Sequence, residues 1–324
     1  MEKRQLGTTN MFVNRIGLGC MGFSHAYGPA MEKKEAIQTL QKAHAIGYDF
    51  YDTAECYLGT YEDGTIANNE EVVGEAIHAF RDEIVLASKF GVRHMGDHLE
   101  MDSSPETIRH SIEGTLTRLK TDHLDLYYQH RIDPKVAPET VAETMKELIK
   151  EGKIRSWGIS ETSEEYLRRA HAVCPVTCIE NRYSMMASWY EELFPVCEEL
   201  GVTYVAFSPL ANGLLSGKYT PSDRFAQGDF RNRMPQYQEE GYRKAQALLD
   251  LLQTIAAEKN CTMAQLSLAW MVCKKPFIVP IPGSRKIARL EENFRAGNVE
   301  VAEDEIKAID EKLSSMDFSV FGGH

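Results

Sequence analysis

The chain has 324 residues, of which 36 are Lys or Arg and 48 are Asp or Glu, giving a formal net charge of −12. This acidic balance argues against a nucleic-acid partner, which needs clustered basic side chains. No apolar run approaches the ~20 residues of a membrane span, and the N-terminus lacks the apolar core of a signal peptide. We therefore expect a cytoplasmic globular protein that has no membrane segment.

The seven cysteines form no CxxC pair. Neither a metal site nor a disulfide framework is therefore expected, and most of these residues are interpreted as buried apolar thiols. Cys20 and Cys56 are the exceptions because both follow predicted strands near the candidate site. Their position raises the hypothesis of thiol-sensitive activity.

A regular alternation of strands and helices follows a short hairpin predicted at residues 4–13. The predicted strands span residues 15–18, 48–51, 84–88, 124–129, 154–159, 177–181, 203–207 and 277–281. The predicted helices span residues 33–46, 69–80, 105–119, 136–150, 164–172, 190–200, 246–274 (divisible into two) and 287–295. Eight such units predict an α/β fold, a (β/α)8 TIM barrel in a single domain 1–324.

The remaining segments fit around this barrel. Residues 303–314 predict an extra C-terminal helix, and residues 316–324 an apolar-tipped end. Three long loops are expected after strands, at residues 23–30, 58–68 and 209–240. In a barrel such loops gather on the face that carries the chemistry.

Polar side chains stand where three of the predicted strands end. Asp52 follows residues 48–51, Lys89 follows 84–88 and His130 follows 124–129. Neighbouring parallel strands lie ~5 Å apart, so the three groups converge, and Tyr57 can fold over them from a loop. The alternative is an ion pair and a histidine that merely seal the barrel. Function is favoured because charges facing a barrel interior are costly unless they are paired or used.

These four groups suit proton transfer to a carbonyl oxygen. A tyrosine of pKa ~10 is too weak an acid at neutral pH, but a lysine ~4 Å away can lower its pKa by at most ~3 units. Asp52 would hold Lys89 in place, and His130 could donate a hydrogen bond to the substrate oxygen. None of the four can deliver a hydride, so a reduction requires a nicotinamide.

Two further segments suggest ligand contacts. Residues 17–22 match the dinucleotide fingerprint GxGxxG, but no helix begins there, so a Rossmann site is disfavoured. We interpret these glycines as permitting close approach of a flat ligand. Residues 282–286 begin a helix after the eighth strand with basic side chains, which predicts an anion site. A solvated basic patch at a helix start is the alternative.

Ordered motifs along essentially the whole chain resemble the aldo-keto reductase family, in particular the branch of auxin-induced plant proteins and bacterial relatives. The motifs are residues 16–19, 50–57, 87–89, 127–131, 157–160, 206–210, 282–286 and 289–293. The resemblance implies that NADPH reduces aldehydes or ketones to alcohols, with Tyr57 as proton donor in a tetrad with Asp52, Lys89 and His130.

The resemblance also implies an extended NADPH site on the barrel. Its residues would be Gly19, Cys20, Met21, Asp52, Ser160, Glu180, Phe207, Ser208, Pro209, Leu210, Lys218, Ser284, Arg285, Arg289, Glu292 and Asn293. Phe207 would stack on the nicotinamide, Ser160 would contact its carboxamide, and residues 284–293 would hold the adenosine and its 2′-phosphate.

This chain departs from the family pattern beside the nicotinamide. Glu161 and Glu180 stand where many members have Asn and Gln, and Arg182 replaces a common Glu. A carboxylate accepts a hydrogen bond from an amide NH2 but cannot donate one to its oxygen. Contact of Glu161 and Glu180 with the carboxamide is therefore an open expectation.

Two other functions compete with a reductase. Some members of the family serve as nucleotide-sensing regulatory subunits with little turnover. A Schiff-base aldolase using Lys89 is the second alternative. The expected partner is a small-molecule carbonyl substrate, and the sequence is compatible with a monomer and with a homo-oligomer.

Overall fold

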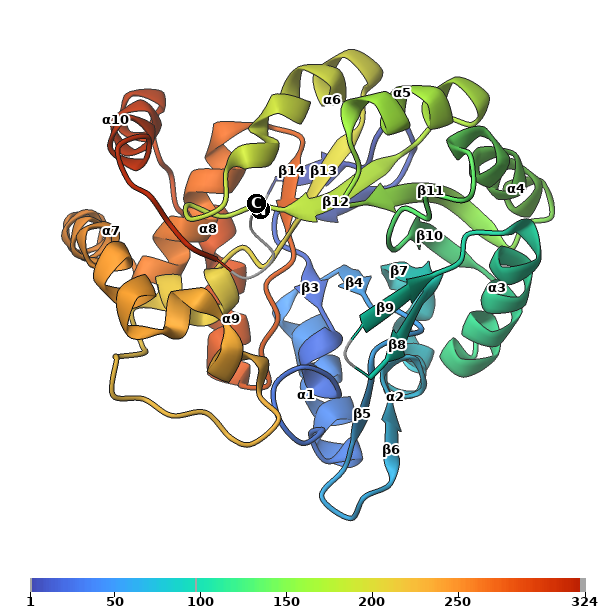
Figure 1. Ribbon diagram of the computed structural model, residues 1–324, viewed down its shortest axis with the longest axis horizontal. Coiled ribbons are helices and arrows are strands. Elements are labelled where there is room, and N and C mark those ends of the chain that lie inside the picture. The colour runs from blue at the N-terminus through green and yellow to red at the C-terminus, as the bar shows by residue number, and fades with distance from the viewer. Residues whose placement is uncertain (1, 97, 321–324) are drawn as a thin grey trace.

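The computed structural model describes residues 2–96 and 98–320 and shows eight parallel strands curled into a barrel with helices around it (Figure 1). The strands are hydrogen-bonded in the order β14-β13-β12-β11-β10-β7-β4-β3. Their bounds are β3 Leu18–Gly19, β4 Phe50–Asp52, β7 Val85–Phe90, β10 Leu124–Gln129, β11 Ile154–Ser160, β12 Cys178–Arg182, β13 Thr203–Phe207 and β14 Ile278–Pro280. The predicted (β/α)8 fold is confirmed.

Helices cover the outside of the sheet (Figure 1). They are α1 Lys33–Ile46, α2 Asn69–Ile77, α3 Pro105–Leu119, α4 Pro138–Lys150, α5 Glu164–Val173, α6 Phe194–Leu200, α7 Glu239–Glu258, α8 Met263–Lys274, α9 Ile287–Arg295 and α10 Glu303–Leu313. The extra C-terminal helix is α10. Residues 321–324 of the predicted apolar end lie outside the described residues.

The predicted helical stretch 246–274 is two helices, and its beginning was placed too late. Asn260 has a φ of 52°, a left-handed conformation that ends a helix. Thr262 then caps α8, because its side chain accepts a hydrogen bond from Gln265 N–H while the Gln265 side chain accepts one from Thr262 N–H. The capping box explains why α8 begins at Met263.

Glycines close the barrel between its first and last strands. The N–H of Gly17 donates to the carbonyl of Pro280 at 3.0 Å. A Cβ on Gly19 would stand 2.7 Å from the Ile281 carbonyl oxygen, and one on Gly283 would stand 2.5 Å from the Gly19 oxygen. Strand-to-strand approach, not a flat ligand, therefore occupies the space beside Gly19, which corrects our interpretation of the glycine pattern.

The chain begins with the predicted hairpin, β1 (Lys3–Gln5) and β2 (Phe12–Asn14). Residues 58–68, predicted as a loop, are instead a second hairpin of β5 (Leu58–Thr60) and β6 (Ile66–Asn68). Its turn contains an Asp-Gly pair, in which Gly64 has a φ of 85°. An Asp-Gly pair is a strong hairpin signal, so this element was readable from the sequence.

A third hairpin, β8 (Val92–Met95) and β9 (His98–Met101), follows β7 and was not predicted. Figure 1 shows the β5–β6 and β8–β9 hairpins at the same end of the barrel. The long loop 209–240 contains three short 3-10 helices: η4 (Ala211–Ser216), η5 (Phe230–Arg233) and η6 (Pro235–Tyr237). These segments surround the carboxyl ends of the strands.

Apolar side chains fill the barrel beneath that end. Inward-facing residues of the strands form a buried cluster with Leu6, Met11 and Val13 of the N-terminal hairpin, which plugs the far end. The Tyr128 ring lies in the space left by Gly158, where a Cβ would stand 2.4 Å from a ring carbon. The polar groups at the carboxyl ends therefore lie directly above a layer of buried apolar side chains.

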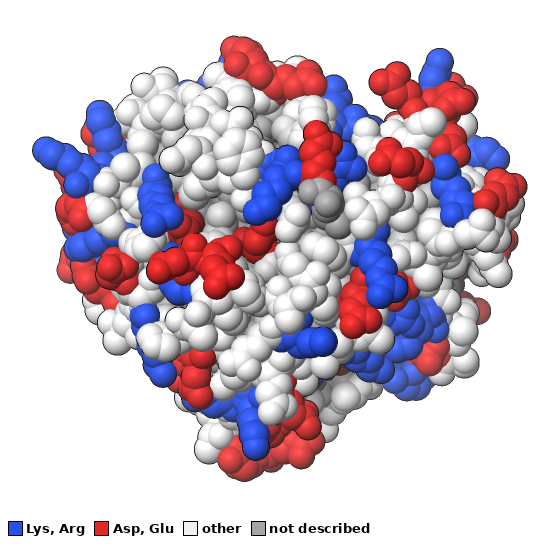
Figure 2. Space-filling view, turned by 180° about the vertical axis from the view of Figure 1, so that it is seen from behind, with Lys and Arg blue, Asp and Glu red and all other residues white. Residues whose placement is uncertain are grey.

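The surface is mixed in charge. Figure 2 shows acidic and basic side chains interspersed on the face turned away from the viewer in Figure 1. Within residues 2–96 and 98–320, none of the helices combines the length and apolar character that a membrane span requires.

Candidate active site

The four residues of the predicted tetrad lie together at the carboxyl ends of three adjacent strands. Asp52 ends β4, Lys89 lies near the end of β7, and His130 directly follows β10. The parallel register places Asp52 beside Ala87 and Lys89 beside Tyr128. Tyr57 reaches the cluster from the segment between β4 and β5, and all four side chains are buried.

Lys89 is the centre of this cluster. Its ammonium donates to Asp52 Oδ1, to the Thr53 carbonyl at 3.0 Å and to the Tyr57 hydroxyl at 3.4 Å. The ammonium also lies 5.8 Å from the centre of the Tyr128 ring. The lysine is fully buried, so its charge acts on these partners without screening by water.

Glu180 is a further partner of Lys89. It lies on β12, it is 3% exposed, and its Oε1 is 3.3 Å from Lys89 Nζ. We had expected this side chain to contact a nicotinamide, and the pairing with Lys89 was missed. Strand alternation carried the signal, because the inward-facing Cys178 places Glu180 on the same interior face two residues later.

The pKa of Tyr57 differs from the expectation. Burial raises it above its usual value of about 10, and the attraction of Lys89 offsets this only in part. Burial alone would lower the pKa of Lys89, but Asp52 and Glu180 raise it. Besides burial, Asp52 and Glu180 also raise the pKa of Tyr57 and so oppose the attraction of Lys89.

His130 is neutral at physiological pH. Burial, then Arg131 and Lys89, hold the pKa of its imidazole well below the usual range. Its Nδ1 lies 3.4 Å from the Cys56 sulfur, and burial raises the pKa of that thiol to about 12. The thiol therefore keeps its proton and can donate it to Nδ1; in that tautomer the ring hydrogen lies on Nε2.

Aromatic and imidazole rings gather above Tyr57. The His25 ring stacks on it with centroids 6.0 Å apart, and His94 and Phe230 lie 5.0 and 5.8 Å from His25. His25 Nδ1 contacts the Leu58 carbonyl at 2.6 Å. The long loops and the β5–β6 hairpin thereby supply one wall of the site.

The predicted nicotinamide contacts lie at the carboxyl ends of β11 and β13, the two strands that flank β12. Phe207 is the last residue of β13. The guanidinium groups of Arg182 and Arg131 lie 4.9 Å and 5.9 Å from the centre of its ring. Ser160 is buried at the end of β11 and accepts a hydrogen bond from Arg131 at 3.1 Å. Glu161 has a φ of 54° and accepts from the Arg182 N–H at 3.1 Å.

The predicted anion site is at the start of α9. Arg285 donates to the Gly22 carbonyl at 2.5 Å and to the Pro29 carbonyl at 2.8 Å, while its buried Nη2 has no hydrogen-bond partner. Arg289 pairs with Glu292 one turn into the helix. Ser284 Oγ accepts from the Lys286 N–H at 3.1 Å, and Asn293 is buried.

The other predicted cofactor residues are spread around the barrel mouth. Cys20 is fully buried and its Sγ contacts the Leu18 carbonyl at 3.8 Å, so its side chain faces the core. Met21 is partly buried against Tyr57 and its neighbours. Ser208, Pro209 and Leu210 follow β13. Lys218 is exposed after η4, with its ammonium 5.5 Å from the Tyr219 ring centre.

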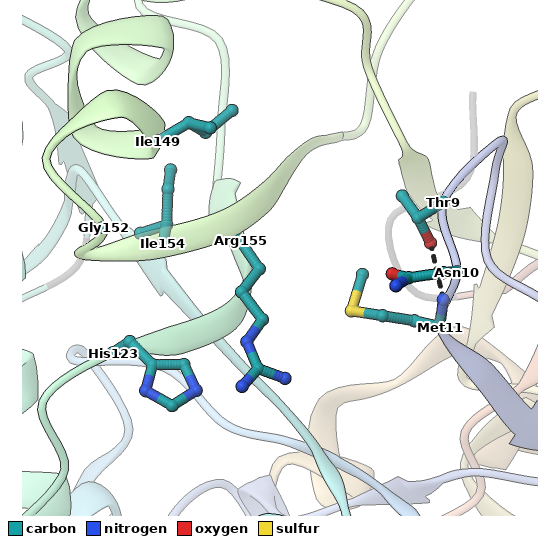
Figure 3. A pocket seen from close by; sticks show the side chains of 8 residues that line it. All are labelled: Thr9, Asn10, Met11, His123, Ile149, Gly152, Ile154 and Arg155. Atoms are coloured by element: carbon teal, nitrogen blue, oxygen red, sulfur yellow. Dashed lines mark hydrogen bonds between the residues drawn. The ribbon is translucent and has the colours of Figure 1, made fainter.

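A cavity of about 680 Å³ lies elsewhere, at the amino ends of the strands. Figure 3 shows residues 9–11 of the hairpin turn facing His123 and Arg155 across it. His123 precedes β10 and Ile154 begins β11. Barrel enzymes carry their chemistry at the opposite end, where the tetrad lies.

Comparison with known proteins agrees with this geometry. The Aldo/keto reductase family model matches residues 15–314. The aldo-keto reductase str7 of Strobilurus tenacellus is 36% identical over 320 residues, covering 95% of this chain and 91% of the relative. The probable aldo-keto reductase 1 of Glycine max is 35% identical over 312 residues, covering 95% and 88%.

A solved structure shares the same architecture. The aldo/keto reductase from Klebsiella pneumoniae in complex with NADP and acetate is 25% identical, with a TM-score of 0.72 and 99% of each chain covered. The family model, the sequence identity over nearly the whole chain and the barrel architecture all agree. The chain therefore belongs to the aldo/keto reductase family.

Proposed function

We propose that this protein reduces aldehydes or ketones to alcohols with NADPH, using Tyr57 as the proton donor. The observation that carries the proposal is the buried Lys89 ammonium 3.4 Å from the Tyr57 hydroxyl. A cation beside a phenol stabilises the phenolate left after proton transfer. The family membership and the NADP-bound relative support the reaction class.

Tyr57 would give its proton to the oxygen of the substrate carbonyl. The negative charge then left on the phenol oxygen faces Lys89, which Asp52 and the Thr53 carbonyl hold in place. Because the site is dry, this attraction is stronger than it would be in water. NADPH, when bound, supplies the hydride.

His130 would orient the carbonyl. With its hydrogen on Nε2, the neutral ring can donate to the same oxygen that receives the Tyr57 proton. The Tyr57 and His130 rings meet edge to face with centroids 5.7 Å apart. Two donors thus flank one position for a reacting oxygen.

The residues present fit NADPH. The unpartnered Arg285 Nη2, the N–H groups at the start of α9 and the cations Lys286 and Arg289 suit phosphate. Phe207 offers an aromatic face at the carboxyl end of β13. These groups would hold the two ends of an extended dinucleotide.

The test is a substrate screen that follows NADPH absorbance with aliphatic, aromatic and anionic aldehydes. Turnover with at least one class, lost in Tyr57→Phe, supports the proposal. Tight NADPH binding without turnover across the panel would favour a nucleotide-sensing role. Borohydride trapping of a carbonyl compound on Lys89 would favour an aldolase.

Cys56→Ala should lower kcat by roughly tenfold, because the thiol no longer fixes which nitrogen of His130 carries hydrogen. Cys56→Ser retains a donor at the same place and should restore most of the rate. Steady-state kinetics of both variants check this prediction. Equal rates for Cys56→Ala and the unaltered enzyme would refute the role of the thiol.

Arg289→Ala should weaken NADPH binding by roughly tenfold to a hundredfold, because a charge-assisted hydrogen bond to the 2′-phosphate is lost. NADH, which lacks this phosphate, should bind nearly as before. Fluorescence titration with both nucleotides measures the difference. Arg295→Ala is the matched control. Arg295 lies at the end of the same helix, with its guanidinium 4.0 Å from the Glu291 carboxylate. Equal weakening of NADPH and NADH would contradict the 2′-phosphate assignment.

A further inference from the structure

Two acidic groups share one buried cation in this site. Asp52 lies on β4, Lys89 on β7 and Glu180 on β12, and each side chain is at most 3% exposed. If both acids were ionised, the three groups would carry a net charge of −1 out of contact with water. Such an uncompensated buried charge is costly.

Each of the two carboxyl groups has one oxygen without a hydrogen-bond partner. Asp52 Oδ1 accepts from Lys89, but Oδ2 is buried and unpartnered. Glu180 Oε1 lies 3.3 Å from Lys89 Nζ, whereas Oε2 is buried and unpartnered. A carboxylate has no hydrogen to give, so two ionised groups leave both oxygens unsatisfied. Asp52 and Glu180 lie within side-chain hydrogen-bond reach of each other, so one proton held by the pair supplies the missing donor.

We propose that Glu180 is a positioning residue that works in its protonated form, donating to Asp52 so that a single carboxylate faces Lys89 during reduction. The inference rests on the proposed reductase function and adds a fifth group to the tetrad. A protonated Glu180 also has the donor and acceptor pair of a glutamine side chain.

The surroundings of Glu180 favour this protonation. The ionisable groups that face it are Asp52, Tyr57, Lys89, Tyr128 and the neighbouring Cys178 on its own strand. Lys89 is the one cation among these described groups, and it already bonds directly to Asp52. Burial, followed by the Asp52 charge, raises the pKa of Glu180 to about 8, although Lys89 opposes the shift.

The protonation state of Glu180 affects the pKa of Tyr57. An ionised Glu180 raises the pKa of Tyr57, as Asp52 does, because a second negative charge disfavours the phenolate. A neutral Glu180 removes that opposition. Reduction, which ends with a phenolate at Tyr57, is therefore fast below the pKa of Glu180 and slow above it.

The test compares the pH dependence of kcat for aldehyde reduction in the unaltered enzyme and in Glu180→Gln. The unaltered enzyme should lose activity as pH rises through about 8. Glutamine cannot ionise and still donates to Asp52. In Glu180→Gln the decline should move upward by at least roughly one pH unit, which leaves a rate at pH 9 about fivefold or more above that of the unaltered enzyme.

Glu70→Gln is the matched control. Glu70 is fully buried and bonds to Ser88 and Arg118, away from Lys89. This variant should keep the high-pH decline of the unaltered enzyme. A decline that is unchanged in Glu180→Gln, or that disappears equally in Glu70→Gln, overturns the inference.

Infrared difference spectroscopy gives a readout independent of turnover. The unaltered protein at about pH 6.5 should show the C=O band of a protonated carboxylic acid, and Glu180→Gln should lack it. Absence of that band from the unaltered protein overturns the inference. If no aldehyde is reduced, the proposed function fails, and the infrared band alone decides the state of Glu180.

Discussion

Tyr57→Phe should reduce kcat for aldehyde reduction by roughly a thousandfold, because a positioned general acid typically contributes 10²–10⁴-fold. Phenylalanine keeps the ring that stacks beneath His25 but has no proton to give. Tyr57 is buried, so water has little access to replace it as a donor. Single-turnover measurements with NADPH and the best aldehyde of the screen would report the chemical step directly.

NADPH affinity should change little in Tyr57→Phe, because the phenol contacts Lys89 and not the predicted phosphate site. Tyr166→Phe is the matched control. Tyr166 lies on helix α5, and its hydroxyl donates a hydrogen bond to Gln129 Oε1 at 3.0 Å. This variant therefore loses a phenol hydrogen bond outside the tetrad. Full activity of Tyr57→Phe would reject Tyr57 as the acid.

Lys89→Met should remove most activity and also destabilise the fold. Asp52 and Glu180 would be left without their cation, and breaking a buried ion pair costs about 3 kcal/mol or more. The loss of stability should be smaller at low pH than at neutral pH, because Asp52 also becomes protonated there and no longer needs a cationic partner. Urea unfolding at several pH values measures the stability, and the aldehyde assay measures the rate.

Lys274→Met separates the two effects. Lys274 pairs with Glu191 at 2.6 Å and Asp310 at 2.8 Å and lies 4.5 Å from the centre of the Trp270 ring, so it too is one cation between two acids. Its loss should lower stability while kcat is retained. A Lys89→Met enzyme as active as Lys274→Met would contradict the role of Lys89.

The convergence of the tetrad could be predicted from the sequence because one rule covers it. Asp52, Lys89 and His130 each lie at or beside the carboxyl end of a strand, and parallel strands end at one edge. The same rule applies to Glu180, but its pairing depends on how far each side chain reaches into the barrel. That depth is a product of packing, and it also decides how burial and Lys89 divide the pKa shift of Tyr57.

Local elements were predicted unevenly for physical reasons. Helices with clear periodicity, such as α1 and α3, have the expected bounds. The β5–β6 hairpin was missed although its Asp-Gly turn signals it, because its apolar residues are few and Ile66 faces solvent. The contact between Gly17 and Pro280 that closes the barrel could not be read from either segment alone, since each supplies the surface on which the other fits.

The glycine seam between Gly17 and Pro280 has a consequence for biosynthesis. Contacts between such distant parts of a chain form late, because closing so long a loop is entropically costly. A polypeptide still on the ribosome, before β14 has emerged, is an open sheet with one side of β3 exposed, and such an edge can recruit a foreign strand. Chains terminated before β14 should therefore aggregate instead of accumulating as weakly active enzyme.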